Sequence, residues 1–485
     1  MNQSLDLSPE AFEQLLARSS ELILDHFQDM EKKKAYHSYP HKEVASWFDE
    51  PLPMEGMDIA TLLELTKEKV MDPSTYNLGP NMYAYVMAGG TQVSIVAEQL
   101  AATINNNMGK WHLAPTLNEI ERRVIQWGGE ITAFGKEAAG IMVSGGSAAN
   151  LAGLTIARNL FFEKQEVRKK GLFGMRPFTI YTSVEVHGCV DKSIEELGIG
   201  TDYLRKIEVN DNATINLEKL EQKIEEDIGA GFTPFCLVGN AGTVNTGAID
   251  DLTALAQLAK KYGMWYHIDG AYGGLLGSLP SVKKEYQGIE LADSLAVDFH
   301  KWMYQPFEAG CVLVRDWDIL RRAYFKKASY LDARLEESGR INFNEHSFQL
   351  SKNAKGFKVW MSLKAYGLKK LQEMMQKDID LAHFLADQVA AHPDFELKSR
   401  SRLAIACFRY VKGCETEEAI EDLNRRLIPA LEKDGRVFIT GTIFQGQFVI
   451  RACLINHRMH KGTVNHLVHV IQEVASNINV TALEY

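Results

Sequence analysis

Short apolar runs alternate with helical stretches between residues 141 and 314, and this alternation constrains the fold more than any other feature of the chain. An alternation on this scale predicts a mainly parallel β-sheet with helices on both of its faces. In such sheets, ligands bind at the carboxyl ends of the strands. Strands are expected at residues 141–143, 179–182, 206–209, 235–239, 264–268, 294–297 and 311–314. Helices are expected at residues 148–164, 190–197, 217–226 and 252–262.

The segments on either side of this region have a different character. Ser8-Pro9-Glu10 is a helix-start signal, and the helix that follows cannot bury its apolar face by itself. The final third predicts a smaller α+β unit, with helices at 374–390 and 417–432 and strands at 403–410, 437–443 and 447–453. We therefore predict an N-terminal helical arm at residues 1–85, a large α/β domain at 86–366 and a small C-terminal α+β domain at 367–485.

Composition argues against several classes of partner. A net charge of −10 makes a nucleic-acid-binding surface unexpected. No uninterrupted apolar stretch approaches the ~18 residues needed to span a bilayer, and the first residues lack the basic-then-apolar pattern of a signal peptide. The six cysteines include no CxxC pair, which predicts reduced thiols and a cytoplasmic protein. His457 and His460 have no neighbouring set of carboxylates or cysteines, so no metal site is expected.

A glycine-rich turn at residues 144–150, which reads SGGSAAN, follows the first expected strand and opens a long helix. Glycines allow backbone N–H groups to approach an anion, and a helix N-terminus adds partial positive charge. The turn matches neither the GxGxxG fingerprint nor the GxxxxGK[ST] phosphate loop, so it indicates a single phosphate rather than a nucleotide. Because glycine–serine turns before helices are common, an ordinary helix start stays open as the alternative.

Three further motifs fall at the ends of expected strands. His187 could stack on an aromatic cofactor and transfer a proton, although a capping or core histidine is the alternative for this residue alone. Asp269 ends an apolar strand, where a buried carboxylate needs a cationic partner such as a ring nitrogen. Lys301 follows His300 directly after another expected strand. A partly desolvated lysine is a nucleophile that forms Schiff bases. The alternative is that the two are ordinary surface residues, as in most isolated His-Lys pairs. Together with the phosphate cradle, these residues predict pyridoxal 5′-phosphate (PLP) as the cofactor.

With these motifs the sequence resembles the pyridoxal-dependent amino-acid decarboxylases of group II and fold type I. That family includes the aromatic-L-amino-acid, histidine, glutamate and cysteine-sulfinate decarboxylases. The resemblance extends from about residue 79 to the C-terminal region and rests on SGGSAAN, HGCVDKS, NAGTVNTGAIDDL, HIDGAYGG, ADSLAVDFHKW and VIRACLIN. It implies a PLP-dependent carboxy-lyase with the α/β fold of the fold-type-I transferases. It also implies a homodimer with the active site at the subunit interface.

The resemblance assigns roles to individual residues. It implies that Lys301 forms the Schiff base with PLP and that Asp269 pairs with the pyridinium nitrogen. It implies that His187 stacks on the ring and takes part in proton transfer. The other residues implied to contact the cofactor are Gly146, Ser147, Ala148 and His300 at the phosphate, and Thr243 and Ala271 beside the ring. Asp298 stands where the family often has asparagine, and a carboxylate at this place would repel a phosphate.

Tyr330 matches a loop tyrosine that the family's decarboxylases use to protonate the substrate carbon. Relatives that form aldehydes oxidatively tend to have phenylalanine at this position, so Tyr330 favours simple decarboxylation. The charged stretch at 332–348 has no clean periodicity and suits a mobile loop or lid. A loop aromatic that only packs is the alternative for Tyr330.

The substrate side chain is the least determined feature of the sequence. Pocket residues are expected at Tyr85, Val86, Trp111, His112 and Arg451, and residues 108–112 are expected to serve the partner's site. An aromatic L-amino acid is favoured, because no distinctive extra arginine is present near this wall to bind a second carboxylate. The alternatives left open are decarboxylation of glutamate, aspartate or cysteine sulfinate, oxidative aldehyde synthesis, another pyridoxal reaction, and a catalytically silent homologue.

Overall fold

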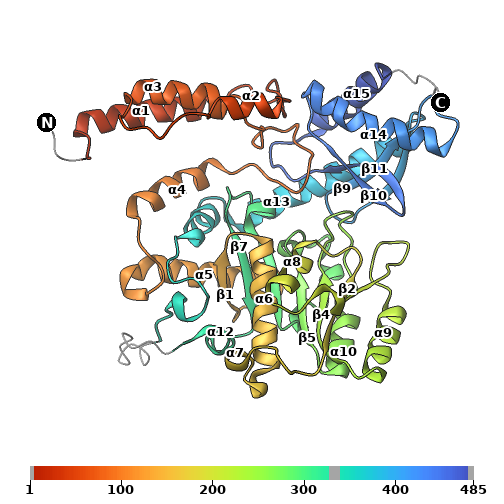
Figure 1. The fold of residues 1–485 in the computed structure, drawn as a ribbon. Coiled ribbons are helices and arrows are strands. Elements are labelled where there is room, and N and C mark those ends of the chain that lie inside the picture. Colours follow the sequence, from red (N-terminus) through yellow and green to blue (C-terminus); the bar gives the residue numbers. More distant parts are fainter. Residues whose placement is uncertain (1–4, 327–338, 479–485) are drawn as a thin grey trace.

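The computed structural model describes residues 5–326 and 339–478 (Figure 1). A large sheet with its helices forms the main body, a smaller sheet lies beside it, and a helical arm runs along the top (Figure 1). Tyr330 and the first part of the expected lid, residues 332–338, lie outside the described residues. The division at residues 85/86 and 366/367 stays a prediction.

The large sheet is mostly parallel and has the strand order β1-β7-β6-β5-β4-β2-β3. Strand β7 runs antiparallel to both β1 and β6, and the other neighbouring pairs are parallel. All seven expected strands are present, and β3 begins two residues earlier than predicted. The strands are β1 (Ala139–Val143), β2 (Phe178–Ser183), β3 (Leu204–Ile207), β4 (Thr233–Asn240), β5 (Trp265–Asp269), β6 (Ser294–Asp298) and β7 (Gly310–Val314).

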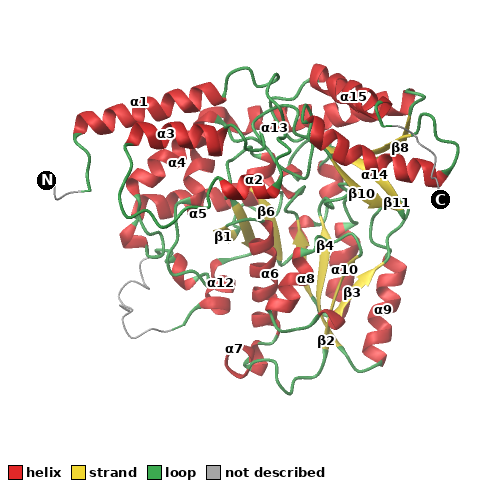
Figure 2. Ribbon diagram, turned by 45° about the horizontal axis from the view of Figure 1, so that its top comes forward, coloured by secondary structure: helices red, strands yellow, loops and turns green. Residues whose placement is uncertain are grey.

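Helices cover this sheet, as expected for a sheet in which β1, β6 and β7 are buried along their whole length (Figure 2). Helix α6 packs on β5, β6 and β7, whereas α9 and α10 pack on β4. The four predicted helices are α6 (Gly146–Phe161), α8 (Cys189–Glu196), α9 (Leu217–Gly229) and α10 (Leu252–Tyr262). The others around this sheet are α5 (Pro115–Ile131), α7 (Val167–Lys170), α11 (Phe299–Trp302) and α12 (Trp317–Tyr324).

The C-terminal part forms an antiparallel sheet of four strands in the order β10-β11-β9-β8. Its strands are β8 (Phe395–Arg400), β9 (Ile405–Tyr410), β10 (Thr440–Phe444) and β11 (Gln447–Cys453). The helices are α13 (Lys355–Ala391), which changes direction at Gly367 with φ of 70°, α14 (Glu417–Asp434) and α15 (Lys461–Ser476). The expected strand at 437–443 begins only at Thr440, and β8 was not predicted.

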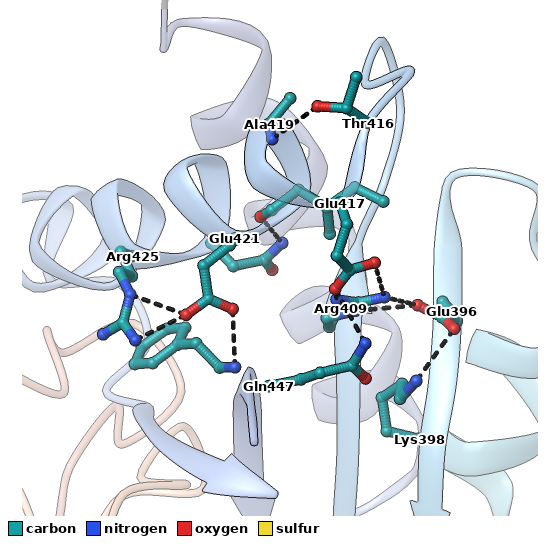
Figure 3. A network of polar contacts seen from close by, with 12 residues as sticks. Glu396, Lys398, Arg409, Thr416, Glu417, Ala419, Glu421, Arg425 and Gln447 are labelled. Carbon is teal, nitrogen blue, oxygen red and sulfur yellow. Dashed lines mark hydrogen bonds and ion pairs between the residues drawn. The ribbon is translucent and has the colours of Figure 1, made fainter. Parts of the chain in front are cut away.

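A polar network joins this small sheet to α14 (Figure 3). The guanidinium of Arg409 on β9 is buried, and its Nε–H donates to Oε2 of Glu396 on β8 at 2.9 Å. The same guanidinium forms an ion pair with Glu417 at the start of α14. Glu421 on α14 accepts from the backbone N–H of Phe448 on β11 at 2.8 Å. Through these contacts one helix fixes three of the four strands relative to one another.

The N-terminal arm contains α1 (Pro9–His26), α2 (His41–Ser46) and α3 (Ile59–Thr66), and α4 (Gln92–Ile104) follows beneath it (Figure 1). Helices α1 and α3 lie side by side, joined by the Arg18–Glu64 ion pair at 2.5 Å. Within the described chain, none of the three arm helices has a buried residue. Large apolar side chains therefore remain on their surface, at Phe12, Leu16, Leu24 and Leu62. In residues 5–326 and 339–478, no helix is both long and apolar enough to cross a membrane.

Candidate active site

A cavity of about 860 Å³ opens at the carboxyl ends of the large-sheet strands and is closed on its other side by β10 and β11. Most of the residues that the sequence singled out line this one space. They are Tyr85, Val86, Gly146, Ser147, Ala148, His187, Thr243, Asp269, Ala271, His300, Lys301 and Arg451. Motifs that are up to several hundred residues apart are therefore brought together by the parallel sheet, as its topology predicts.

The N-terminus of α6 forms one end of the cavity. Gly145 caps the helix without a side-chain hydrogen bond, so the first N–H groups of α6 are not bound by a capping side chain. A Cβ atom on Gly146 would lie 2.7 Å from the Cβ of Ala271 and 2.8 Å from Oδ2 of Asp298. Only glycine allows the helix to begin this close to β5 and β6. The space and the helix dipole both suit an anion.

Lys301 enters the cavity from α11, directly after β6. Its Nζ lies 3.0 Å from Oδ2 of Asp298, and its side chain is 18% exposed. The neighbouring His300 is buried, and its Nδ1 accepts a hydrogen bond from the backbone N–H of Ala309 at 3.2 Å. Burial lowers the pKa of His300 to about 4, so its ring is neutral near neutral pH. The lysine is thus held by a carboxylate rather than exposed to bulk solvent.

Asp269 is the last residue of β5 and is almost fully buried. Its Oδ1 accepts from the backbone N–H of Ala271 at 3.1 Å, which fixes the orientation of the carboxyl group. It stands beside Asn240 in the β4–β5 register, and the side chain of Asn240 donates to Asp250 at 3.0 Å. The carboxyl ends of β4 and β5 thereby present a fixed acid to the floor of the cavity.

His187 lies on the exposed rim, where its Nδ1 accepts from the backbone N–H of Cys189 at 3.1 Å. This bond holds the ring in one orientation, and in a neutral ring it leaves the proton on Nε2. The thiol of Cys189 also lines the cavity, but burial raises its pKa to about 12, so it is not a nucleophile near neutral pH. Thr243 is buried, with its hydroxyl 3.0 Å from that of Thr246.

Sequence reasoning did not find a buried chain of hydrogen bonds that supports the floor of the cavity. His267 on β5 contacts Oδ1 of Asn150 at 2.9 Å and Oγ of Ser294 at 2.8 Å. Asn150 in turn donates to the carbonyl of Gly146 at 3.0 Å. Burial lowers the pKa of His267 to about 3, so its role is to connect α6 to β5 and β6 as a neutral ring. The only signal in the sequence was that Asn150 belongs to the motif SGGSAAN and His267 to the motif HIDGAYGG.

Arg451 on β11 joins the small sheet to Tyr85 and to the loop that follows β4. Its guanidinium donates to the carbonyls of Tyr85 at 2.8 Å, Val244 at 2.6 Å and Asn245 at 3.1 Å, and the residue is buried. In the part of the chain that the structure describes, no carboxylate forms an ion pair with it. A guanidinium has five N–H donors, so these backbone bonds leave capacity for a ligand. Sequence reasoning missed other lining residues of the small domain, namely Thr440, Thr442 and Phe448.

Trp111 and His112 do not line this cavity of their own chain, and their expected place in the partner's substrate pocket stays a prediction. The backbone N–H of Trp111 donates to Asn342 at 3.0 Å, and its indole N–H donates to Glu119 at 2.9 Å. The guanidinium of Arg340 covers its ring at 4.5 Å. These contacts hold Trp111 away from the cavity of its own chain, just before the start of α5. Tyr330, the expected proton donor, lies outside the described residues.

Three kinds of comparison with known proteins agree on the family that this chain resembles. A family model described as the pyridoxal-dependent decarboxylase conserved domain matches residues 40–411. An aromatic-L-amino-acid decarboxylase of Bacillus atrophaeus is 30% identical over 99% of this chain and 99% of its own length. Tyrosine decarboxylase 4 of Petroselinum crispum is 26% identical over 96% of this chain and 92% of its own length. The crystal structure of Oryza sativa TDC with PLP and tryptamine has the same fold, with a TM-score of 0.92 at 22% identity, covering 98% of this chain and 100% of that chain.

Proposed function

Because this chain belongs to the family of pyridoxal-dependent decarboxylases, and is therefore a PLP-dependent carboxy-lyase, we propose that its cavity holds PLP on Lys301 and decarboxylates an aromatic L-amino acid. The observation that carries the assignment of the site is the convergence of three groups on one cavity. The amine of Lys301, the carboxyl group of Asp269 and the N-terminus of α6 all line it.

The described residues fit the cofactor. The glycines at the start of α6 leave a space that a single Cβ would fill, and the helix N-terminus there suits a phosphate, with Ser147 beside it. Asp269 uses Oδ1 for the backbone of Ala271, and its Oδ2 suits a protonated ring nitrogen. His187 stands on the rim with a fixed ring, in a place suited to cover the cofactor from solvent. Bound PLP supplies a sink for the electrons that remain when CO2 leaves.

The chain's own residues then have separate tasks. Lys301 supplies the nitrogen that bonds to the cofactor, and Asp269 keeps a proton on the ring nitrogen. Arg451 binds the substrate carboxylate through the N–H groups that its backbone bonds leave, because its position on β11 fixes them toward the cavity. Tyr330 delivers a proton to the substrate carbon once the site has closed.

Two observations favour an aromatic substrate. The relatives named above include aromatic-L-amino-acid and tyrosine decarboxylases. In addition, of the described residues that line the cavity, only Lys301 and Arg451 are lysine or arginine. Because both have a task in the reaction, neither is left to neutralise a second carboxylate such as that of glutamate, aspartate or cysteine sulfinate. Val86, Ile428 and Phe448 provide apolar surface instead.

The exposed apolar residues of the arm support a homodimer. Helices α1, α2 and α3 bury no residue in the described chain, and α4 also exposes Val96, Leu100 and Ile104. A second copy of the chain would cover these surfaces and would let Trp111 and His112 approach the partner's cavity. The six free cysteines, five of them buried, support a reducing, cytoplasmic location.

The test is to incubate the PLP-loaded protein with a panel of L-amino acids and to identify the products by mass spectrometry. We expect CO2 and the amine from an aromatic amino acid, and no product from the Lys301→Ala variant. Faster turnover of glutamate, aspartate or cysteine sulfinate would contradict the substrate assignment. An aldehyde as the main product would indicate an oxidative aldehyde synthase instead, and we expect that product to increase only in Tyr330→Phe.

A further inference from the structure

The carboxyl group of Asp298 stands beside the helix N-terminus to which the proposed function assigns the phosphate. A Cβ on Gly146 would lie 2.8 Å from Asp298 Oδ2, so this oxygen is next to the first turn of α6. Asp298 is 2% exposed and ends β6, where its backbone is in register with Gly310 of β7. An anion cradle in this protein therefore has a buried acid at its edge.

The two oxygens of this carboxyl group have different surroundings. Oδ2 lies 3.0 Å from Nζ of Lys301 and 3.5 Å from Nε2 of His300. Oδ1 is buried and has no hydrogen-bond partner among the described residues. A buried acceptor without a donor is unfavourable. A proton held at Oδ2, the oxygen beside the first turn of α6, would remove the negative charge and so lower the cost of leaving Oδ1 without a donor.

The charged and titratable groups around Asp298 do not supply that proton. His300 accepts a hydrogen bond at Nδ1, and burial lowers its pKa to about 4, so it contributes no charge near neutral pH. Cys311 on β7 is uncharged, because burial raises the pKa of its thiol. The more distant charges are already paired, as Glu121–Lys352, Glu308–Lys355 and Glu98–Lys358. Asp269, across the cavity floor, is itself an acid. Lys301 is thus the one cation that contacts Asp298 within the described chain.

A phosphate dianion would bring two negative charges next to this carboxylate, and like charges at short range oppose ionisation of both groups. We propose that Asp298 couples cofactor binding to the uptake of one proton from solvent, which is then shared between its carboxyl group and the phosphate. Whether the O–H bond is formed on the carboxyl or on the phosphate oxygen, one proton is bound and the net charge is the same. The inference rests on the proposed function, because it requires the phosphate to lie at α6.

The proton number can be measured with pyridoxamine 5′-phosphate, which has the phosphate and the ring but no aldehyde to react with Lys301. Apoprotein is titrated by calorimetry at about pH 8, where the free phosphate is a dianion because its second pKa is about 6. Repeating the titration in two buffers with different ionisation enthalpies gives the number of protons taken up. The wild type is compared with Asp298→Asn, and Glu308→Gln is the matched control, since Glu308 also lines the cavity but pairs with Lys355 at 2.9 Å.

We expect the wild type and Glu308→Gln to take up close to one proton and Asp298→Asn close to none. We also expect the dissociation constant of the wild type to rise about tenfold for each pH unit above neutral, and that of Asp298→Asn to change far less. Pyridoxamine without phosphate should show no difference between the proteins. Equal proton numbers in wild type and Asp298→Asn, no proton uptake by the wild type, or no binding of pyridoxamine 5′-phosphate would overturn the inference. If PLP still bonds to Lys301 in that case, the proposed function survives, whereas loss of that bond would refute the proposed function itself.

Discussion

Replacing Gly146 with alanine tests whether the start of α6 is the phosphate cradle. The added Cβ would lie 2.7 Å from Ala271 Cβ and 2.8 Å from Asp298 Oδ2, closer than non-bonded atoms approach, so the first turn of the helix must move. Overpacking of this kind costs about 1–3 kcal/mol. If this cost falls on the bound state, PLP binds roughly 5- to 140-fold more weakly, because about 1.4 kcal/mol corresponds to a factor of ten. Helix propensity alone predicts that the substitution stabilises α6, because alanine is a better helix former than glycine.

The assay is an equilibrium titration of apoprotein with PLP, followed by absorbance, with thermal unfolding of the apoprotein measured in parallel. Gly188→Ala is the matched control. Gly188 caps α8 next to His187 with φ of −57°, and a Cβ there would have no atom within 4 Å. We expect its PLP affinity to equal that of the wild type. A folded Gly146→Ala protein that binds PLP within about twofold of the wild type, a difference worth less than ~0.5 kcal/mol, would refute the assignment of the cradle.

Three further predictions follow from the described contacts. Arg409→Leu should lower the free energy of unfolding by about 1.5–3 kcal/mol in urea titrations, the usual range for hydrogen bonds to charged groups. Replacing the exposed Arg425 of the same network with leucine should change it by less than ~0.5 kcal/mol. Equal effects of the two substitutions would show that the buried position of Arg409 is unimportant. Arg451→Lys should lower kcat/KM for an aromatic amino acid by about 10- to 100-fold while PLP binding is kept, because lysine lacks the planar fork; unchanged kcat/KM would exclude Arg451 from carboxylate binding. Burial lowers the pKa of His267 to about 3. Between about pH 6.5 and 3 the unfolded chain therefore binds a proton at this residue that the folded chain does not, so the melting temperature should decrease as the pH is lowered through this window. His267→Gln should show a shallower fall, and identical slopes would contradict this reading.

The central part of the fold was predictable because its strands are buried on both faces. Strands β1, β6 and β7 are fully buried along their length. Their sequences are mainly apolar, with Ser294 and Asp298 only at the two ends of β6, and they stand out from the helices around them. Strand β8, Phe395–Arg400, was missed because it lies at the edge of its sheet, where its polar side chains are only half-buried or exposed. Helix α4 was missed too, although its exposed apolar residues Val96, Leu100 and Ile104 recur every four residues, as on one face of a helix.

The site was predictable only where its residues belong to local motifs at strand ends. Lys301, Asp269 and Gly146 fall in this class, and the parallel sheet brings such ends together. Contacts between distant segments carry no local signal, as the bonds of His267 to Asn150 and of Arg451 to Val244 illustrate. The same reason applies to the contacts of Trp111 with Asn342 and Glu119, whereas its expected place in the partner's pocket stays a prediction.

The central claim is that Lys301 binds the cofactor, and chemical trapping tests it directly. The PLP-loaded protein is treated with borohydride, which makes a carbon–nitrogen bond between lysine and cofactor irreversible, and the modified peptide is identified by mass spectrometry. The account predicts a single cofactor-bearing peptide that contains Lys301, and none from Lys301→Ala treated in the same way. Label on a different lysine, or no label on a protein that still releases CO2 from an amino acid, would contradict it.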